Sequence, residues 1–207
     1  MKTYFTKKQN KVILIAALLI IVIGGILLFT YINPPKDNIA AKALPEEYFC
    51  DIGESYIDYQ TAGNCAAYAA AYVLRCLGEQ IEGEIIAPEM QRIFGFVPAN
   101  SIVNVFENHE FIAEAYCGNI DSLKQRLTEG IPVIAFVDIP GDTHYVVVVG
   151  YDRQYIYLAD SLEADKNAEG NCYNRKLETA EFERIWRTAT ILTDNIYIAA
   201  RRPDSSM

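Results

Sequence analysis

Residues 12 to 32 of this chain contain no charged side chain and are almost wholly apolar, from Val12 to Ile32. Wound as an α-helix, such a stretch is ~30 Å long, which matches the hydrocarbon thickness of a bilayer. Four lysines precede it, at positions 2, 7, 8 and 11, whereas Asn33 and two prolines follow it. The excess of positive charge before the span predicts a cytoplasmic N-terminus over residues 1–11 and a domain outside the cytoplasm after the span.

A cleavable signal peptide is the alternative interpretation of the same residues. The apolar run exceeds the ~7–15 residues that are usual for the apolar core of such a peptide, and no Ala-x-Ala cleavage site follows closely. No cysteine lies near the end of the span, which argues against a lipid-modified N-terminus. We therefore expect residues 12–32 to be an uncleaved transmembrane signal-anchor helix.

The rest of the chain is predicted to form one domain. Residues 33–45 hold three prolines among mixed polar residues and predict a linker, which leaves 46–207 for the folded part. The net charge of −9 becomes more negative once the lysine-rich start is set aside. A nucleic-acid partner requires a basic surface, so this composition argues against one.

Helical patterns come first along the domain and strand patterns follow them. Helices are expected at 65–77, 82–93, 101–108, 121–129 and 179–187, and strands at 111–117, 132–137, 144–151, 155–160 and 195–200. The strands 144–151 and 155–160 are separated by a short turn, which predicts an antiparallel hairpin. This order predicts an α+β fold with an antiparallel sheet.

Cys65 follows the turn residues Gly63 and Asn64 and opens an alanine-rich run with high helix propensity. At the first residue of a helix, unpaired backbone N–H groups and the positive end of the helix dipole favour a negatively charged thiolate. Gln60, five positions earlier, can bring a side-chain N–H donor to the same point. A thiol beside such a donor indicates acyl chemistry with Cys65 as the nucleophile.

The base for such a nucleophile must come from two histidines. His109 lies in a polar connection, which is typical of a surface residue. His144 is the first residue of an apolar strand run, where an imidazole can take a proton from a thiol and pass it to a leaving amine. Asp160 ends the partner strand of the predicted hairpin, so its carboxylate is expected to orient His144. Alone, Asp160 is typical of a strand-ending turn; together with His144, Cys65 and Gln60 it completes a set of four roles.

The four remaining cysteines, Cys50, Cys76, Cys117 and Cys172, allow three disulfide pairings among which the sequence does not choose. Buried free thiols are an equally good interpretation of Cys76 and Cys117. Two histidines and no Cys-x-x-Cys motif make no ligand-spaced cluster, so we expect neither a metal nor a cofactor.

Several segments together resemble the C39-like branch of papain-like cysteine peptidases. They are Gln60-x4-Cys65 opening an alanine-rich helix, Gly-Ile-Pro-Val-Ile-Ala-Phe from residue 130, His-Tyr-Val-Val-Val-Val-Gly-Tyr-Asp from residue 144, and Tyr-Leu-Ala-Asp-Ser from residue 157. The resemblance extends from Gln60 to Trp186. It implies a papain-like fold with the cysteine on an N-terminal helical part and the histidine and aspartate on a C-terminal sheet.

The resemblance assigns one role to each of four residues: Cys65 matches the nucleophile, His144 the base, Asp160 the third member and Gln60 the oxyanion donor. Many relatives have Cys-Gly-Pro or Cys-Gly where this chain has Ala66 and Ala67 after the cysteine, and Asp-Pro where it has Asp160 and Ser161. Neither difference removes a reacting group, but both bear on substrate preference. The ATP-binding and transporter regions of peptide exporters do not follow, which implies a stand-alone anchored domain.

We therefore expect a membrane-anchored cysteine peptidase that hydrolyses a peptide or amide bond in a peptide or protein substrate. Two alternatives remain open from the sequence. The fold can serve as a binding domain without activity, and the same nucleophile and base can transfer an acyl group to an amine in place of water.

Overall fold

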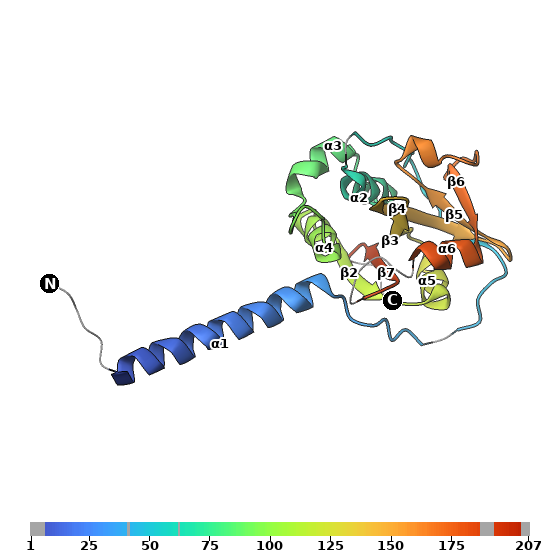
Figure 1. Cartoon of the computed structure of the whole chain (residues 1–207). Coiled ribbons are helices and arrows are strands. Elements are labelled where there is room, and N and C mark those ends of the chain that lie inside the picture. Colours follow the sequence, from blue (N-terminus) through green and yellow to red (C-terminus); the bar gives the residue numbers. More distant parts are fainter. Residues whose placement is uncertain (1–6, 41, 62, 187–192, 204–207) are drawn as a thin grey trace. The chain divides into compact units, whose positions relative to one another are not determined.

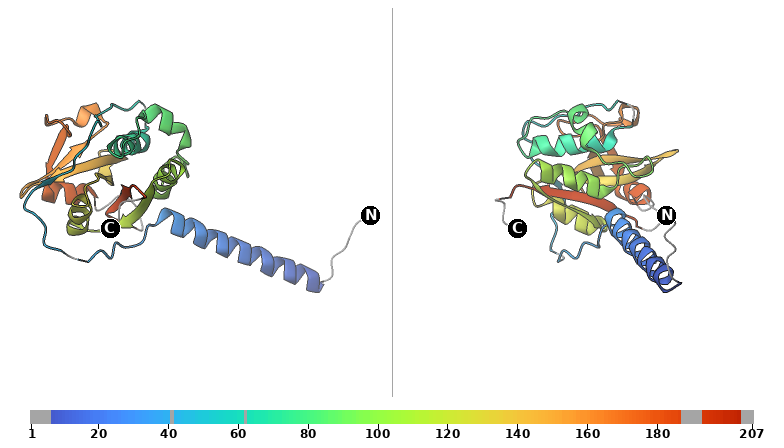
Figure 2. Two further views of the ribbon diagram at one scale, coloured as in Figure 1. Left: turned by 180° about the vertical axis from the view of Figure 1, so that it is seen from behind. Right: turned by 90° about the vertical axis from the view of Figure 1, so that its left-hand side faces the viewer.

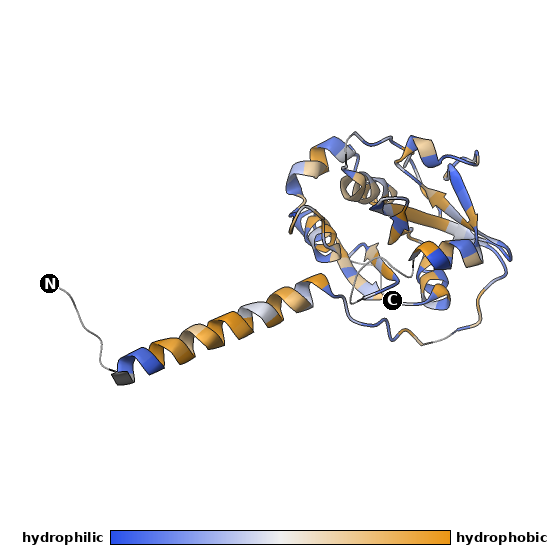
Figure 3. Cartoon of the chain, viewed as in Figure 1, coloured by the Kyte–Doolittle hydropathy of each residue, from blue (hydrophilic) through white to orange (hydrophobic). Residues whose placement is uncertain are grey.

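The computed structural model describes residues 7–40, 42–61, 63–186 and 193–203 (Figure 1). The chain divides into two compact units, Met1–Asn33 and Pro34–Met207. The first unit contains helix α1 (Lys7–Ile32), which is coloured as an almost continuous apolar stretch in Figure 3. From Gln9 to Ile32 it is long and apolar enough to cross a membrane, a property that it shares with signal sequences.

The second unit is built on one antiparallel sheet, which confirms the predicted α+β class. The strands follow the order β2–β7–β3–β4–β5–β6, and β1 adds to β4. The predicted hairpin is formed by β4 and β5. The strands are β1 (Tyr48–Phe49), β2 (Ile112–Cys117), β3 (Val133–Ile139), β4 (Asp142–Tyr151), β5 (Tyr155–Ala159), β6 (Arg175–Glu178) and β7 (Ile196–Arg201).

Helices cover both faces of this sheet. They are α2 (Cys65–Cys76), α3 (Gly83–Ile86), α4 (Ala99–Asn108), α5 (Ile120–Leu127) and α6 (Thr179–Trp186), with short 3₁₀ helices η1 (Ala87–Glu89) and η2 (Glu163–Asp165). Helix α2 lies on the opposite side of the central strands from α5 and α6 (Figures 1 and 2). Along β3, Ile134 and Phe136 pack towards α2 and α4, whereas Val133, Ala135 and Val137 pack towards α5 and α6. A strand that is buried on both faces must be apolar at every position, which explains the unbroken apolar run in the sequence.

Helix α2 is the central element of one layer. Its residues from Ala66 to Arg75 are all buried, and the small alanine side chains allow the helix to lie close against β4. Arg75 is buried as well, and its guanidinium donates to the carbonyl oxygens of Ile81 at 2.7 Å and Tyr56 at 2.8 Å. The helix ends at Cys76, and Gly78 adopts a left-handed φ of 98°, as expected for a helix stop.

Two expectations about local structure were wrong. The helix expected at 82–93 is limited to α3 and η1, because Pro88 cannot donate a backbone hydrogen bond and Met90 is extended. His144 is the third residue of β4, not its first, since Pro140 and Gly141 form a two-residue turn that pairs Ile139 with Asp142. Residues 161–174 are irregular apart from η2, as expected, and β6, which the sequence did not predict, follows them and pairs with β5. Arg187, where the last helix was expected to end, lies outside the described residues.

The residues expected to form a linker are bonded to the domain beside the edge strand β2. Cys117 N donates to Pro35 O and Asp37 N donates to Cys117 O, both at 2.8 Å. Further along, Gln125 Nε2 donates to Ala40 O at 2.7 Å. The two bonds of Cys117 cover part of the exposed edge of β2, which would otherwise present unpaired backbone groups.

An ion pair between Asp37 and Arg126 anchors this segment. The guanidinium donates to the two carboxylate oxygens at 3.0 and 3.1 Å, and the side chains are 2% and 9% exposed. The Tyr197 hydroxyl donates to the same carboxylate. Burial raises the pKa of Asp37, but the bonds from Arg126 and Tyr197 outweigh it and hold that pKa below its ordinary value. The carboxylate therefore stays charged at neutral pH.

We expect Asp37→Ala to lower the free energy of unfolding of residues 34–207 by about 3–5 kcal/mol, because it leaves the buried Arg126 without this partner. The matched control is Glu46→Ala, which removes the exposed ion pair with Arg153 and should change the stability by less than about 1 kcal/mol. Chemical denaturation of the two variants measures the difference. Equal losses would contradict a stabilising role for the buried pair.

Candidate active site

Cys65 is the first residue of α2 and its side chain is half-buried. Gly63 takes a left-handed φ of 73°, a conformation that glycine adopts without steric cost and that lets the chain turn into the helix. Because the first N–H groups of a helix have no acceptor within it, the thiol lies among backbone donors. The structure thus confirms the expected position of Cys65 at a helix start.

His144 and Asp160 meet at the adjacent ends of β4 and β5. Val147 pairs with Ala159, which brings the start of β4 beside the residue that follows β5. The His144 Nε2 and Asp160 Oδ1 atoms are hydrogen-bonded at 2.7 Å, and the two side chains are 2% and 0% exposed. Since Nε2 is bound to the carboxylate, Nδ1 is the ring nitrogen that remains for an interaction with the nearby Cys65 thiol.

Asp160 is held by further bonds that the sequence did not reveal. Its Oδ1 accepts from Leu162 N at 2.9 Å, and its Oδ2 accepts from Arg175 Nη1 at 2.8 Å. The Asn174 side chain makes two hydrogen bonds to the backbone of Asp160, both at 2.8 Å. Its Oδ1 accepts from Asp160 N, and its Nδ2 donates to Asp160 O. Burial alone raises the pKa of Asp160, but the bonds and charges of His144, Leu162 and Arg175 lower it. The carboxylate is therefore fixed in place and stays ionised.

The pKa of His144 responds to both neighbours. Burial lowers it, but the hydrogen bonds and charges of Asp160 and Cys65 outweigh burial and raise the pKa from 6.5 to about 9. The imidazole is thus held protonated between a carboxylate and a thiol. This is the charge state in which a histidine can deliver a proton to a leaving group.

Gln60 lies against the loop that follows β5. Its backbone N–H donates to Ser161 O at 2.9 Å, and the Ser161 hydroxyl donates to Gln60 Oε1 at 3.3 Å. The amide is therefore held beside the residue that follows Asp160. His144 lies between the Asp160 carboxylate, to which it is hydrogen-bonded, and the Cys65 thiol, which raises its pKa.

Asn174 and Arg175 are the site residues that sequence reasoning missed. Residues 161–174 looked irregular, so nothing indicated that the chain returns to Asp160. Residues 175–178, Arg-Lys-Leu-Glu, have a single apolar residue and so gave no clear strand signal, yet they form β6, which pairs with β5.

His109 is more buried than expected for a surface residue, and it lies between two carboxylates. Its Nδ1 is 2.6 Å from Glu79 and its Nε2 is 3.3 Å from Glu89. Burial lowers the pKa of His109, but its hydrogen bonds to the two glutamates, and their negative charges, outweigh burial and raise the pKa. Within the described residues, no group of three or more histidine, cysteine or acidic side chains is arranged to hold a metal ion.

All five cysteines carry free thiols in the structure. Burial raises the pKa of Cys76 to about 12 and that of Cys117 to about 11. It also raises the pKa of the Cys50 and Cys172 thiols. These four thiols are therefore poor nucleophiles at neutral pH.

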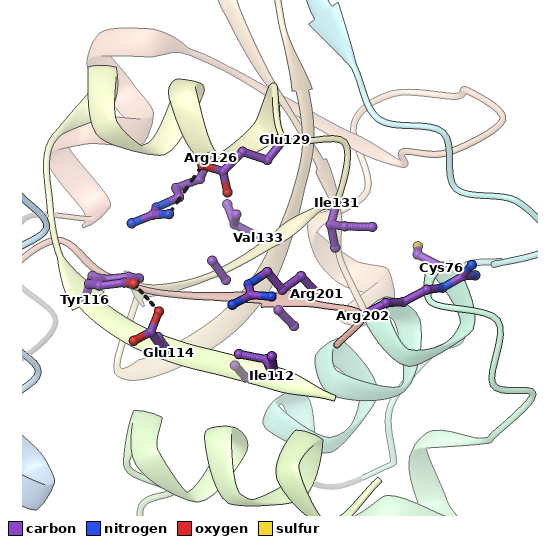
Figure 4. Close-up of a pocket in the computed structure, with 13 residues that line it drawn as sticks. Cys76, Ile112, Glu114, Tyr116, Arg126, Glu129, Ile131, Val133, Arg201 and Arg202 are labelled. Carbon is purple, nitrogen blue, oxygen red and sulfur yellow. Dashed lines mark hydrogen bonds and ion pairs between the residues drawn. The ribbon is translucent and has the colours of Figure 1, made fainter. Parts of the chain in front are cut away.

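A cavity of about 360 Å³ lies elsewhere, over strands β2 and β7 and the end of α5 (Figure 4). Arg126 is bonded to Glu129 on one side of it and Tyr116 to Glu114 on another. None of the four candidate site residues lines it. The candidate active site is thus defined by its hydrogen bonds and not by the volume of a cavity.

The comparisons with known proteins agree with this fold. The Peptidase_C39 like family matches residues 52–192, so the chain belongs to the C39-like peptidase family. Among proteins of curated function, a sequence search finds no match.

Several solved structures share the fold, among them three peptidases. One is a C39-like peptidase from Bacillus anthracis, with TM-score 0.58 and 15% identity over 76% of this chain and 100% of that one. Another is the peptidase domain of Streptococcus ComA, a bi-functional ABC transporter of a quorum-sensing pathway, with TM-score 0.55 and 14% identity over 70% and 97%. The third is a double-glycine-motif protease from an AMS/PCAT transporter in complex with the leader peptide, with TM-score 0.52 and 18% identity over 82% and 98%. At these identities the likeness concerns the fold alone.

The raised pKa of His144 predicts a pH dependence of stability. A group whose pKa is higher in the folded state stabilises the fold below its unfolded pKa of about 6.5, and this stabilisation is lost as the pH rises through about 9. Between about pH 6.5 and pH 9, the free energy of unfolding of residues 34–207 should therefore decrease as the pH rises. The decrease should be up to ~3 kcal/mol larger in the wild type than in the variant His144→Gln. Denaturation curves recorded from pH 6 to about pH 10 test this, and parallel profiles for the two proteins would refute it.

Proposed function

We propose that this chain is a membrane-anchored cysteine peptidase whose domain lies outside the cytoplasm. The observation that carries the proposal is the buried hydrogen bond between His144 and Asp160, together with the Cys65 thiol, which lies close enough to His144 to raise its pKa. Membership of the C39-like peptidase family supports it. The structurally similar transporter protease is described in complex with a leader peptide, which supports a peptide as the substrate.

The arrangement suits a two-step hydrolysis. In the first step the Cys65 thiolate, whose proton is carried by His144, attacks the substrate carbonyl carbon, and His144 gives that proton to the departing amine, which leaves an acyl group on the sulfur. In the second step a water molecule attacks that acyl group and gives its proton to His144. The acid product then departs and the Cys65 thiolate is released beside the protonated imidazole. Asp160 keeps the imidazole oriented and stabilises its positive charge throughout.

The negative oxygen that develops on the substrate needs hydrogen-bond donors. The backbone N–H of Cys65 is at the first position of α2, where it has no acceptor within the helix. The Gln60 Nε2 group is the second donor in this proposal, with Ser161 holding the opposite end of its amide. Two such donors, fixed before the reaction, stabilise the transition state without reorganising.

Helix α1 is the basis for the proposed location of the domain outside the cytoplasm. Its length and apolar composition suit a membrane span, and the lysines that precede it favour a cytoplasmic N-terminus. The domain that follows would then act on substrates outside the cytoplasm.

The thiol chemistry is tested by labelling at pH 7 with a fluorescent iodoacetamide, followed by peptide mapping. We expect Cys65 to be labelled first, because burial raises the pKa of the other four thiols. His144→Ala should slow the reaction at residue 65 at least about tenfold, whereas the matched variant His109→Ala should not. Equal labelling rates in the wild type, Cys65→Ser and His144→Ala would contradict the proposed nucleophile.

Hydrolysis itself is tested by incubating the protein with a broad peptide library and identifying the products by mass spectrometry. The wild type should cleave peptides and Cys65→Ser should not. Gln60→Ala should lower kcat by about 10²–10³ with little change in KM, because its donor acts on charge that develops in the transition state. The matched control is Gln154→Ala at an exposed glutamine. An unchanged kcat in Gln60→Ala would remove Gln60 from the mechanism, and products joined to an added amine would indicate acyl transfer.

A further inference from the structure

Phe94 is the most exposed large apolar side chain among the described residues, with 92% of its surface open to solvent. It lies in the loop between η1 and α4, and Phe96 in the same loop is 36% exposed. Aromatic side chains of this size are usually buried, because their exposure to water is unfavourable. The position of Phe94 therefore requires an explanation other than packing of the domain.

The conformation of the loop makes phenylalanine still less expected at this position. Ile93 and Phe96 pair through two backbone hydrogen bonds, from N to O in each direction, at 2.8 and 3.2 Å. The two residues between them have positive φ values, 50° at Phe94 and 92° at Gly95. Asparagine or glycine is the usual choice in such a turn, whereas a bulky residue is strained there. Neither the turn nor the core explains an aromatic ring at residue 94.

The loop is fixed at its start to the turn that precedes the nucleophile. Arg92 Nη2 donates to Gly63 O at 3.1 Å and to Asn64 Oδ1 at 3.0 Å, and its Nη1 donates to Gly95 O at 3.4 Å. One guanidinium thus joins the tip of the loop to the residues directly before Cys65.

The end of the loop is fixed to the strand that carries the base. The Tyr145 hydroxyl donates to Val97 O at 2.8 Å, and Tyr145 is buried directly after His144 in β4. The loop is therefore attached both to the turn before Cys65 and to the residue after His144. It thus borders the two segments that carry the candidate reacting groups.

We propose that Phe94 binds a bulky apolar side chain of the substrate peptide near the bond that is cleaved. This inference rests on the proposed peptidase function and adds a substrate class to it: peptides with an aliphatic or aromatic residue close to the scissile bond. Contact with such a side chain removes the exposed ring from water, which is the favourable change that binding supplies. The attachment through Arg92 and Val97 holds the ring in place before the substrate arrives, so that less ordering is needed on binding.

The test uses the full chain in detergent and three variants. Phe94→Asn keeps a residue that tolerates the turn and removes the apolar surface, Phe94→Leu keeps apolar surface, and Cys65→Ser is the inactive control. The probes are a peptide from the library that the wild type cleaves, and the same peptide with its apolar residues next to the cleaved bond replaced by alanine.

We expect Phe94→Asn to lower kcat/KM on the apolar peptide about 10-fold or more, mainly by raising KM. The loss on the alanine peptide should be less than about 3-fold, and Phe94→Leu should recover most of the loss. The rate of iodoacetamide labelling at Cys65 should be the same in all Phe94 variants, since the ring acts on the substrate and not on the thiol.

Three results would overturn the inference. One is an equal kcat/KM for Phe94→Asn and the wild type; another is a cleavage profile without preference for apolar residues. Slower labelling of Cys65 in Phe94→Asn would be the third, because it would assign the loop a structural role. If the wild type cleaves peptides and Cys65→Ser does not, these results contradict only the role of Phe94 and leave the proposed peptidase function intact. Absence of wild-type turnover contradicts the proposed function and this inference together.

Discussion

The hydrogen bond between His144 and Asp160 is the interaction on which the rest of the site depends. Removing a carboxylate and an imidazolium from water is costly, and it is tolerated only where the pair is close and its other polar atoms are satisfied. Arg175, Leu162 and Asn174 satisfy Asp160 here. The pair therefore requires β4, β5 and the start of β6 to be assembled, and the base is ready for reaction only in the folded sheet.

The nucleophile reaches this pair because α2 can lie close to the sheet. Its run of alanines gives a helix with little side-chain bulk, so the first residue of the helix arrives beside the start of β4. Buried Arg75 ties α2 to the backbone at Tyr56 and Ile81, and the loop of Arg92 ties the turn before Cys65 to the region next to His144. Cys65 belongs to the helical layer and His144 to the sheet. Side-chain hydrogen bonds to backbone carbonyl oxygens hold the segments around these two residues in place.

Polar bonds of the same kind attach the segment that follows α1. Asp37 is buried against Arg126 and Tyr197, and the neighbouring backbone pairs with Cys117 at the edge of β2. In the proposed setting on a membrane, the domain would be connected to its anchor by a chain segment that is bonded to the domain at Pro35, Asp37 and Ala40. The cavity over β2 and β7 lies near this segment, since Arg126 contributes to both, and away from the candidate active site.

Much of the fold and the four candidate residues followed from the sequence alone. The charge-free stretch from Val12 to Ile32, the alanine-rich helix after Cys65 and the β-rich runs around Asp152 are local patterns, and local patterns determine local structure. The sequence could not show that Asn174 and Arg175 return to Asp160, that Asp37 is buried, or that the pKa of His144 is raised to about 9. These features depend on groups that are distant in the chain and meet only after folding. In the folded interior, low solvent exposure strengthens the hydrogen bonds and the interactions between charges. The tertiary structure alone decided them.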